Sequence, residues 1–233
     1  MRTLSCLVIS IMLFSFCPLS THAQIVYGPI IGANSSDFDV DLPKVLPINV
    51  DFRRRVGLGI GWGFDYYIGN FGALSLQFLY LQKGKRVSIQ DVTVGNSEVD
   101  FKLDYLEVPL FLKLGFGTLD VTHLYIFGGP NIGFNLRARA EVATPTTNVD
   151  FDINRGIKTF DLGFGLGVGL HFPVTGGNRF VFFEGRYIIG TSNVLEKSIV
   201  LNGGSIETGT IAKSRDLQLM LGVSFSSSFP PVR

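Results

Sequence analysis

The sequence predicts an all-β protein: a single eight-stranded, antiparallel, up-and-down β-barrel that spans a membrane. Three observations predict it. Eight segments alternate between apolar residues and polar or small ones, as strands between two different environments do. The chain contains 28 Gly and 21 Phe, yet beyond its N-terminal segment it has no apolar run of the roughly 18 residues that a membrane-spanning helix needs. That N-terminal segment has the features of an export signal.

Residues 1–23 are expected to form a cleaved secretory signal peptide. Arg2 supplies the positive start, residues 4–16 form the apolar core, and Thr21 and Ala23 place small residues before the cleavage point. The alternative is an N-terminal membrane anchor, which the short apolar core disfavours. We therefore predict that residues 24–225 form the barrel and that residues 226–233 form a short tail.

Cysteine and charge content narrow the class of protein further. Cys6 and Cys17 both fall within the expected signal, so the exported chain has no disulfide and must be stabilised by packing or by a membrane. Arg2 is the only charged residue of the signal, which leaves 19 basic and 19 acidic residues in the exported chain. A neutral chain lacks the basic footprint of a nucleic-acid-binding protein, so we expect no nucleic-acid partner.

The alternation is clearest in three segments, at 56–66, 160–172 and 217–225. In the first, large apolar residues at even positions alternate with glycines and one aspartate. Five further segments follow the pattern less regularly, at 25–33, 74–80, 106–114, 124–136 and 181–189. Most reach the length of a strand tilted across a bilayer, which exceeds the usual strand of a soluble sheet. Their number is even, as in single-chain outer-membrane barrels.

The volume of the barrel decides which face meets lipid. A soluble, lipocalin-like barrel would point the large apolar residues inward, but eight strands enclose room for little more than one layer of side chains. The reverse orientation places the apolar residues against outer-membrane lipid and the small and polar residues around the lumen. The expected lipid-facing residues are Leu58, Ile60, Trp62, Phe164, Leu166, Leu219, Leu221 and Phe225.

Charged residues on the predicted luminal side are interpreted as an internal salt-bridge network, because a buried charge without a partner is costly. A polar conduit or a ligand site is the alternative. Glycine rows at 57–63 and 163–169 leave space for large side chains from other strands, so we expect a plugged lumen. The luminal charges are Glu107, Lys113, Arg137, Asp161, Glu184, Arg186 and Asp216.

The connections between the predicted strands alternate in length. Long, polar loops are expected at 34–54, 85–99, 139–156 and 191–212, and short turns near 69–70, 118–120 and 175–178. Barrels of this class place long loops outside the cell and short turns in the periplasm, so both chain ends are expected in the periplasm. The last strand ends at Phe225, which resembles the terminal signal that the barrel-assembly machinery reads during biogenesis.

No residue pattern predicts catalysis, a metal site or a cofactor. His123 and His171, the histidines outside the signal, map to strand ends without a neighbouring nucleophile, and two are too few for a standard metal site. The glycines repeat every second residue within strands, whereas a phosphate-binding loop needs Gly-x-Gly-x-x-Gly before a helix. We expect a protein that is not an enzyme.

The segment at 103–113, Leu-Asp-Tyr-Leu-Glu-Val-Pro-Leu-Phe-Leu-Lys, resembles a middle strand of an outer-membrane β-barrel family of Bacteroidota that is often called PorT-like. This resemblance implies a small, porin-like outer-membrane barrel with OmpA/OmpX-like architecture. Most members of the family have no defined function and one branch serves a type IX secretion system, but the segment does not assign this chain to that branch. Pro109 fits a lumen-facing position near a bulge, since proline cannot donate to a central ladder.

Three functions stay open on the sequence alone. The first is a structural or interaction protein that displays surface loops or supports envelope integrity. The second is a component of a secretion or assembly machine, which binds envelope or secretion-system proteins. The third is a narrow channel for small solutes, which a conductance measurement would separate from the other two.

Overall fold

The structure is a computed structural model that describes residues 24–40, 49–68, 72–91, 95–115, 121–143, 147–174, 179–194, 198–201, 204–207 and 212–227. The predicted signal peptide at 1–23 and the end of the tail at 228–233 lie outside the described residues. Eight long strands contain most of the described chain. They are β1 (Gln24–Val40), β2 (Asn49–Ile68), β3 (Gly72–Asp91), β4 (Gly95–Gly115), β5 (His123–Ala143), β7 (Phe160–Val174), β8 (Arg179–Gly190) and β11 (Ala212–Ser227).

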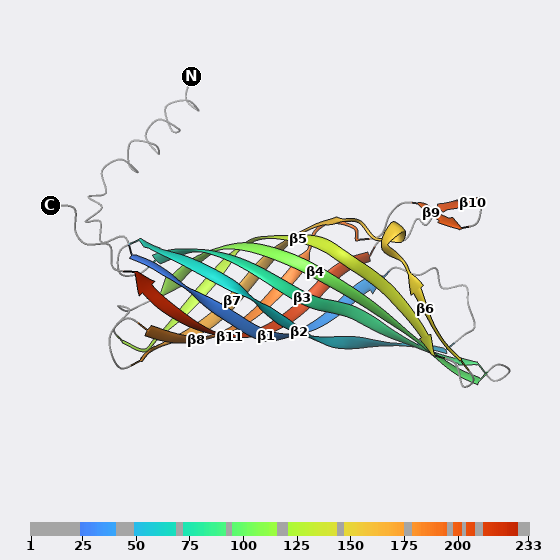
Figure 1. Ribbon diagram of the computed structural model, residues 1–233, viewed down its shortest axis with the longest axis horizontal. Helices are drawn as coiled ribbons and strands as arrows, with labels where there is room; N and C mark the ends of the chain where they lie inside the picture. The colour runs from blue at the N-terminus through green and yellow to red at the C-terminus, as the bar shows by residue number, and fades with distance from the viewer. Residues whose placement is uncertain are drawn as a thin grey trace, which may run out of the picture.

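The eight strands form a closed antiparallel ring. Their order around the ring is β4, β3, β2, β1, β11, β8, β7 and β5, and pairing between β5 and β4 closes it. The first and last strands meet from Ile25 opposite Ser227 to Val40 opposite Ala212. Figure 1 shows the strands tilted around a cylinder, with β1 beginning and β11 ending at the same end. The predicted eight-stranded antiparallel barrel is confirmed.

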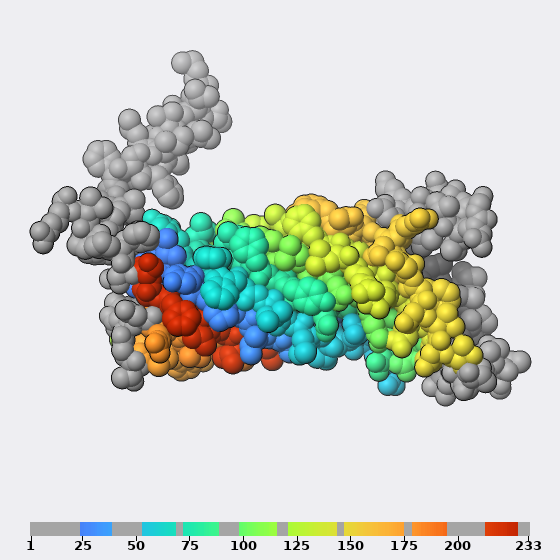
Figure 2. All heavy atoms as spheres, viewed as in Figure 1, coloured from blue at the N-terminus to red at the C-terminus, as the bar shows by residue number. Residues whose placement is uncertain are grey.

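The two ends of the cylinder differ. We call the end where β1 begins the turn end, and the opposite end the loop end. At the loop end, β6 (Asn148–Asp152) pairs with β5, and the 3₁₀ turn η1 (Asn154–Gly156) follows it. The strands β9 (Ser198–Leu201) and β10 (Gly204–Glu207) form a separate hairpin. Figure 2 shows β6, in yellow, projecting at the loop end.

The two faces of each strand have opposite chemistry. Along β7, Leu162, Phe164 and Leu166 are exposed on the outer surface, whereas Asp161 and His171 are buried inside the barrel. The eight residues that we expect to face lipid all lie on the outer surface, each at least 37% exposed. A surface this apolar around a partly polar interior is the reverse of a soluble barrel. Within the described part of the chain, no helix is long and apolar enough to cross a membrane.

The glycine row of β7 makes room for aromatic side chains inside the barrel. A Cβ added at Gly167 would lie 2.3 Å from the ring of Phe127, and one at Gly169 would lie 2.2 Å from the ring of Tyr125. Both rings come from β5, the strand next to β7. The rings therefore lie directly on the glycine backbone, which is the small-against-large packing that a narrow barrel interior needs.

The loops expected at 34–54, 85–99 and 139–156 are largely strand, which corrects the sequence analysis. β1 runs on to Val40, β2 already begins at Asn49, and β3 and β4 extend to Asp91 and from Gly95. The outer face of these extensions carries charged rather than apolar residues, so the alternation reverses while the backbone ladder continues: in β4, Val99, Phe101 and Leu103 alternate with Glu98, Asp100 and Lys102. The turns expected near 69–70, 118–120 and 175–178 lie outside the described residues.

A bulge in β5 changes which residues face inward. Tyr105 lies opposite Asn135 while Asp104 lies opposite Arg137, so β5 has one extra residue at this point. The extra residue shifts the inward and outward positions, and Arg137 is exposed on the outer surface. The prediction of a luminal Arg137 is therefore wrong. Pro109 is buried inside as expected, but the bulge lies further along the barrel.

Candidate functional site

The lumen holds an ion cluster that joins distant parts of the wall. Lys83 of β3 reaches Asp216 of β11 with its Nζ 2.6 Å from Oδ2, and it also forms an ion pair with Glu107 of the neighbouring β4. All three side chains are at most 1% exposed. Gln218 of β11 donates a hydrogen bond of 3.2 Å to Glu107. Since β11 and β4 are four strands apart in a ring of eight, this bond crosses the whole lumen.

A second cluster lies nearer the turn end. Lys113 of β4 places its Nζ 2.9 Å from Asp65 of β2 and 2.8 Å from Glu184 of β8. The hydroxyl of Tyr125 donates a 2.8 Å hydrogen bond to Glu184. The ammonium of Lys113 also lies 5.2 Å from the centre of the Tyr125 ring, within range of a cation–π interaction. The ammonium of Lys113 and the carboxylate of Glu184 thus join four strands, β2, β4, β5 and β8.

Arg186 of β8 spans the lumen between the two clusters. Its Nη1 donates a 2.8 Å hydrogen bond to Gln77 of β3, on the opposite wall, and its guanidinium lies 5.8 Å from the centre of the Phe111 ring. Arg186 is 1% exposed and is one of the largest fully buried side chains. A side chain of this size across an eight-stranded lumen fills the space that a solute would need.

Apolar residues fill the lumen around the charged groups and at the loop end. Ile30, Leu79, Leu81, Phe182 and Met220 form one buried cluster inside the barrel. A second buried cluster lies at the loop end, where residues near η1 pack against it. The backbone N–H of Lys158, after η1, donates a hydrogen bond to the carbonyl of Val194, after β8. The members of this second cluster are Phe38, Leu103, Tyr105, Ala138 and Val194, and Ile153 and Ile157 pack against it.

The turn end of the lumen is lined by rings. His171 is buried, with its ring centre 4.8 Å from that of His123 and 4.7 Å from that of Phe180. His123 and His171 lie directly opposite each other on β5 and β7. No group of three or more His, Cys, Asp or Glu side chains that could hold a metal ion is found in the described part of the chain.

Six of the seven charged residues predicted to be luminal lie inside the barrel, and Arg137 does not. The structure brings Glu107 and Asp216 together in one cluster and Lys113 and Glu184 in the other. Asp161 stands apart and accepts hydrogen bonds from Ser192 and Ser214. The predicted set of luminal charges left out five partners in these networks, Asp65, Gln77, Lys83, Tyr125 and Gln218, of which only Lys83 lies outside the segments that the alternation marked.

Beyond the apolar part of the outer surface, the strand extensions at the loop end are joined by ion pairs between strands. Lys102 of β4 pairs with Glu141 of β5, and this hydrogen bond and its charge lower the pKa of Glu141 below its ordinary value. Arg86 of β3 contacts Glu98 of β4 at 2.7 Å. Such cross-strand pairs stabilise the contact between adjacent strands. Arg54–Asp37 and Arg86–Asp100 also join neighbouring strands, whereas Lys85–Asp37 and Arg55–Asp100 each reach past one strand, from β3 to β1 and from β2 to β4.

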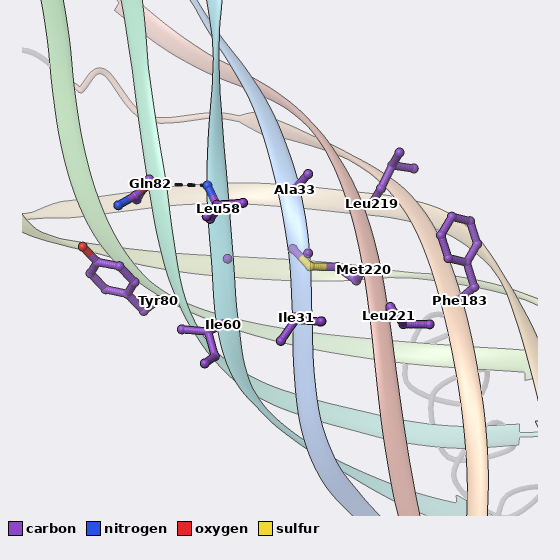
Figure 3. A pocket seen from close by; sticks show the side chains of 12 residues that line it. Ile31, Ala33, Leu58, Ile60, Tyr80, Gln82, Phe183, Leu219, Met220 and Leu221 are labelled. Atoms are coloured by element: carbon purple, nitrogen blue, oxygen red, sulfur yellow. Dashed lines mark hydrogen bonds between the residues drawn. The ribbon is translucent and has the colours of Figure 1, made fainter.

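The outer wall carries an apolar groove of about 580 Å³ over β1. It forms because Ala33 is small where the flanking strands carry larger residues, while Met220 lies beneath the adjacent Gly32 from the luminal side. Figure 3 shows Leu58 and Ile60 on one side of β1 and Leu219 and Leu221 on the other. No charged side chain lines the groove. Its chemistry suits hydrocarbon.

Solved structures of other proteins resemble this chain at low sequence identity. A search of the curated proteins gives no match. The solved structure of OprG from Pseudomonas aeruginosa is similar, with 16% identity, a TM-score of 0.48 and coverage of 89% of this chain and 96% of OprG. Neisserial surface protein A has 15% identity and a TM-score of 0.43, with 88% and 97% coverage. Ail of Yersinia pestis has 14% identity and a TM-score of 0.39, with 89% and 100% coverage.

A family model gives the clearest relationship. The model described as outer membrane protein beta-barrel domain matches residues 22–196, which is more than half of the chain. The matched residues include seven of the eight strands of the ring. The protein belongs to this family and is a β-barrel of the outer membrane.

Proposed function

We propose that this protein is a closed outer-membrane barrel that acts as an interaction protein at the cell surface, and that it is neither a channel nor an enzyme. The observation that carries the proposal is the filled lumen. Side chains from opposite walls meet inside it, as in the pairs Arg186–Gln77 and Gln218–Glu107, and apolar clusters occupy the space around them. A solute would have to separate buried charges from their partners in order to pass.

The orientation follows from the general rule for this class of barrel. Short turns face the periplasm and the longer, elaborated connections face the outside, so the loop end is the external end. This orientation places the extensions of β2 to β5 and the strand β6 outside the cell. It also agrees with an export signal at residues 1–23, and with the outer-membrane lipid and barrel-assembly machinery as partners of the barrel.

A conductance measurement tests the closed lumen. We expect the folded protein, reconstituted in planar bilayers, to give no steady current above that of bilayers treated with detergent alone. A large-pore porin inserted in the same membranes serves as the control that the assay detects insertion of an open barrel. Reproducible single-channel steps with the pure protein would overturn the proposal and favour the narrow solute channel.

A role in protein secretion is the second candidate. It is supported by the likeness of the segment at 103–113 to the PorT-like family of Bacteroidota, and this segment lies in β4. Glu107 and Lys113 of this segment belong to the two luminal ion clusters. Their role in the stability of the barrel therefore explains their presence equally well. Co-purification of the full-length protein with components of a secretion system would favour this second role.

A further inference from the structure

Among the described residues, the strand β6 ends the sheet with an unpaired edge. It pairs along its whole length with β5 and with no other strand of the described residues. All five of its residues are exposed, including Val149 at 42% and Phe151 at 51%. Figure 1 shows β6 beside the loop-end extension of β5, away from the closed part of the ring. An exposed edge strand is a template for pairing with another chain.

The hydrogen bonding shows which backbone groups this edge offers. The N–H of Ile153, just after β6, donates to the carbonyl of Ala138 in β5 at 3.1 Å. Because backbone groups point to alternate sides along a strand, Phe151 and Val149 also direct their N–H and C=O groups toward β5. The backbone groups of Asp150 and Asp152 therefore point away from β5, toward the unpaired edge.

The two faces of β6 differ in chemistry. Phe151 lies opposite Ala140 and Val149 lies opposite Val142, so the apolar residues of β6 continue a row that includes Val99 of β4. The other face carries Asp150 and Asp152. Asp152 accepts a hydrogen bond from the N–H of Asn154, whereas Asp150 makes no ion pair with any described residue. The edge thus combines an apolar side with an acidic side.

We propose that the edge of β6 binds an extended segment of a partner protein in which Lys or Arg alternates with apolar residues. The basic residues of the added strand would lie opposite Asp150 and Asp152, and its apolar residues would extend the row of Val149 and Phe151. The added strand gains main-chain hydrogen bonds from the edge and specificity from its alternating side chains. This proposal deepens the interaction role inferred above by naming the chemistry of the partner.

The same charges disfavour a second copy of this chain at the edge. Antiparallel pairing of β6 with itself would bring the carboxylates of Asp150 and Asp152 together across the new ladder. Like charges opposite each other in a ladder are destabilising. The acidic side therefore favours a basic partner and disfavours self-association.

The test uses the full protein folded in phosphocholine vesicles and a fluorescent peptide of alternating Lys and Val. We expect the peptide to bind the protein and not empty vesicles. A peptide of alternating Glu and Val should bind about three- to tenfold more weakly, since the ion pairs that it loses are exposed and screened by solvent. A peptide with the same Lys and Val residues in two separate blocks should not bind, because it cannot place one kind of residue on each face.

Two variants locate the binding to the edge. Asp150→Pro removes an N–H that points to the unpaired edge and leaves the ladder to β5 intact, so we expect it to abolish binding. Asp150→Asn keeps that N–H and loses one charge, so binding should weaken by only about threefold. Unchanged gel mobility of both unheated variants would show that the barrel still folds.

Three outcomes would overturn the proposal: equal binding by the block peptide, equal binding by Asp150→Pro, or a dimer of the protein that Asp150→Pro abolishes. The last would assign the edge to a second copy. Failure here is distinguishable from failure of the proposed closed barrel. A protein that conducts ions and still binds the alternating peptide refutes only the closed lumen, whereas a closed barrel that ignores the peptide refutes only the partner chemistry.

Discussion

Lys83 shows at the scale of a single residue why the luminal charges belong to the structure. It holds two carboxylates, Glu107 and Asp216, which would otherwise be buried without a cation beside them. We expect Lys83→Met to lower the free energy of unfolding by about 3–5 kcal/mol, because removing one partner leaves uncompensated buried charge. Urea titration of the protein folded in vesicles measures this change.

The matched control for Lys83 is Arg86, a cation on the same strand that is 46% exposed and pairs with Glu98. Arg86→Gln should change the free energy of unfolding by less than about 1 kcal/mol, because solvent screens the pair. Adding Glu107→Gln and Asp216→Asn to Lys83→Met should recover part of the loss. Equal urea midpoints for Lys83→Met and the native protein would contradict a structural role for the cluster.

Gly167 tests the packing of rings on the glycine row. A Cβ there would lie 2.3 Å from the Phe127 ring and 2.7 Å from the carbonyl oxygen of Gly185. We expect Gly167→Ala to cost about 1–3 kcal/mol through overpacking. Gly185→Ala is the control, since its Cβ would meet only Leu219, at 3.7 Å. Thermal unfolding in detergent compares the two variants, and similar midpoints would show that the ring moves aside freely.

The strands show which parts of this architecture can be read from the chain. Wherever lipid and lumen impose different chemistry on alternate residues, as along β2 and β7, the pattern predicts both the strand and its orientation. The pattern fails where that difference ends. Lys83 lies beyond the last apolar outward residue of β3 and was missed, although it continues the inward series of Leu79 and Leu81. Arg137 was misplaced because the bulge in β5 adds a residue that no local signal marks.

The strand extensions should respond to pH through their cross-strand ion pairs. Lys102 lowers the pKa of Glu141, so the pair contributes stability above the unfolded pKa of the carboxyl group and loses it as the pH falls through the lower, folded pKa. We expect NMR titration of the folded protein to place this pKa below the ordinary value for glutamate. Lys102→Gln should raise the pKa of Glu141 toward that value. An unchanged pKa in the variant would assign the shift to another cause.

At the scale of the whole molecule, the cylinder combines an apolar belt with a filled, ion-paired interior. In water, the outer surface would expose more apolar area than a soluble protein tolerates. The barrel cannot avoid this by turning these side chains inward, because the lumen of eight strands has no room for them all. The ring also satisfies the backbone hydrogen bonds of every spanning strand without help from solvent. The barrel is therefore a structure whose folding depends on an amphiphilic environment.

The cost of a charged residue on the outer surface should depend on its depth in the membrane. Leu166, near the middle of β7, and Val174, at its turn-end limit, are both exposed on the outer surface, at 55% and 41%. A charge at the centre of the hydrocarbon costs far more than one at the interface, so we expect Leu166→Arg to destabilise the vesicle-bound protein by about 2–4 kcal/mol and Val174→Arg by about 0–1 kcal/mol. Urea titration in vesicles separates these values. Equal costs at the two positions, or a native protein that folds as a monomer without lipid or detergent, would mean that the apolar belt does not face a bilayer.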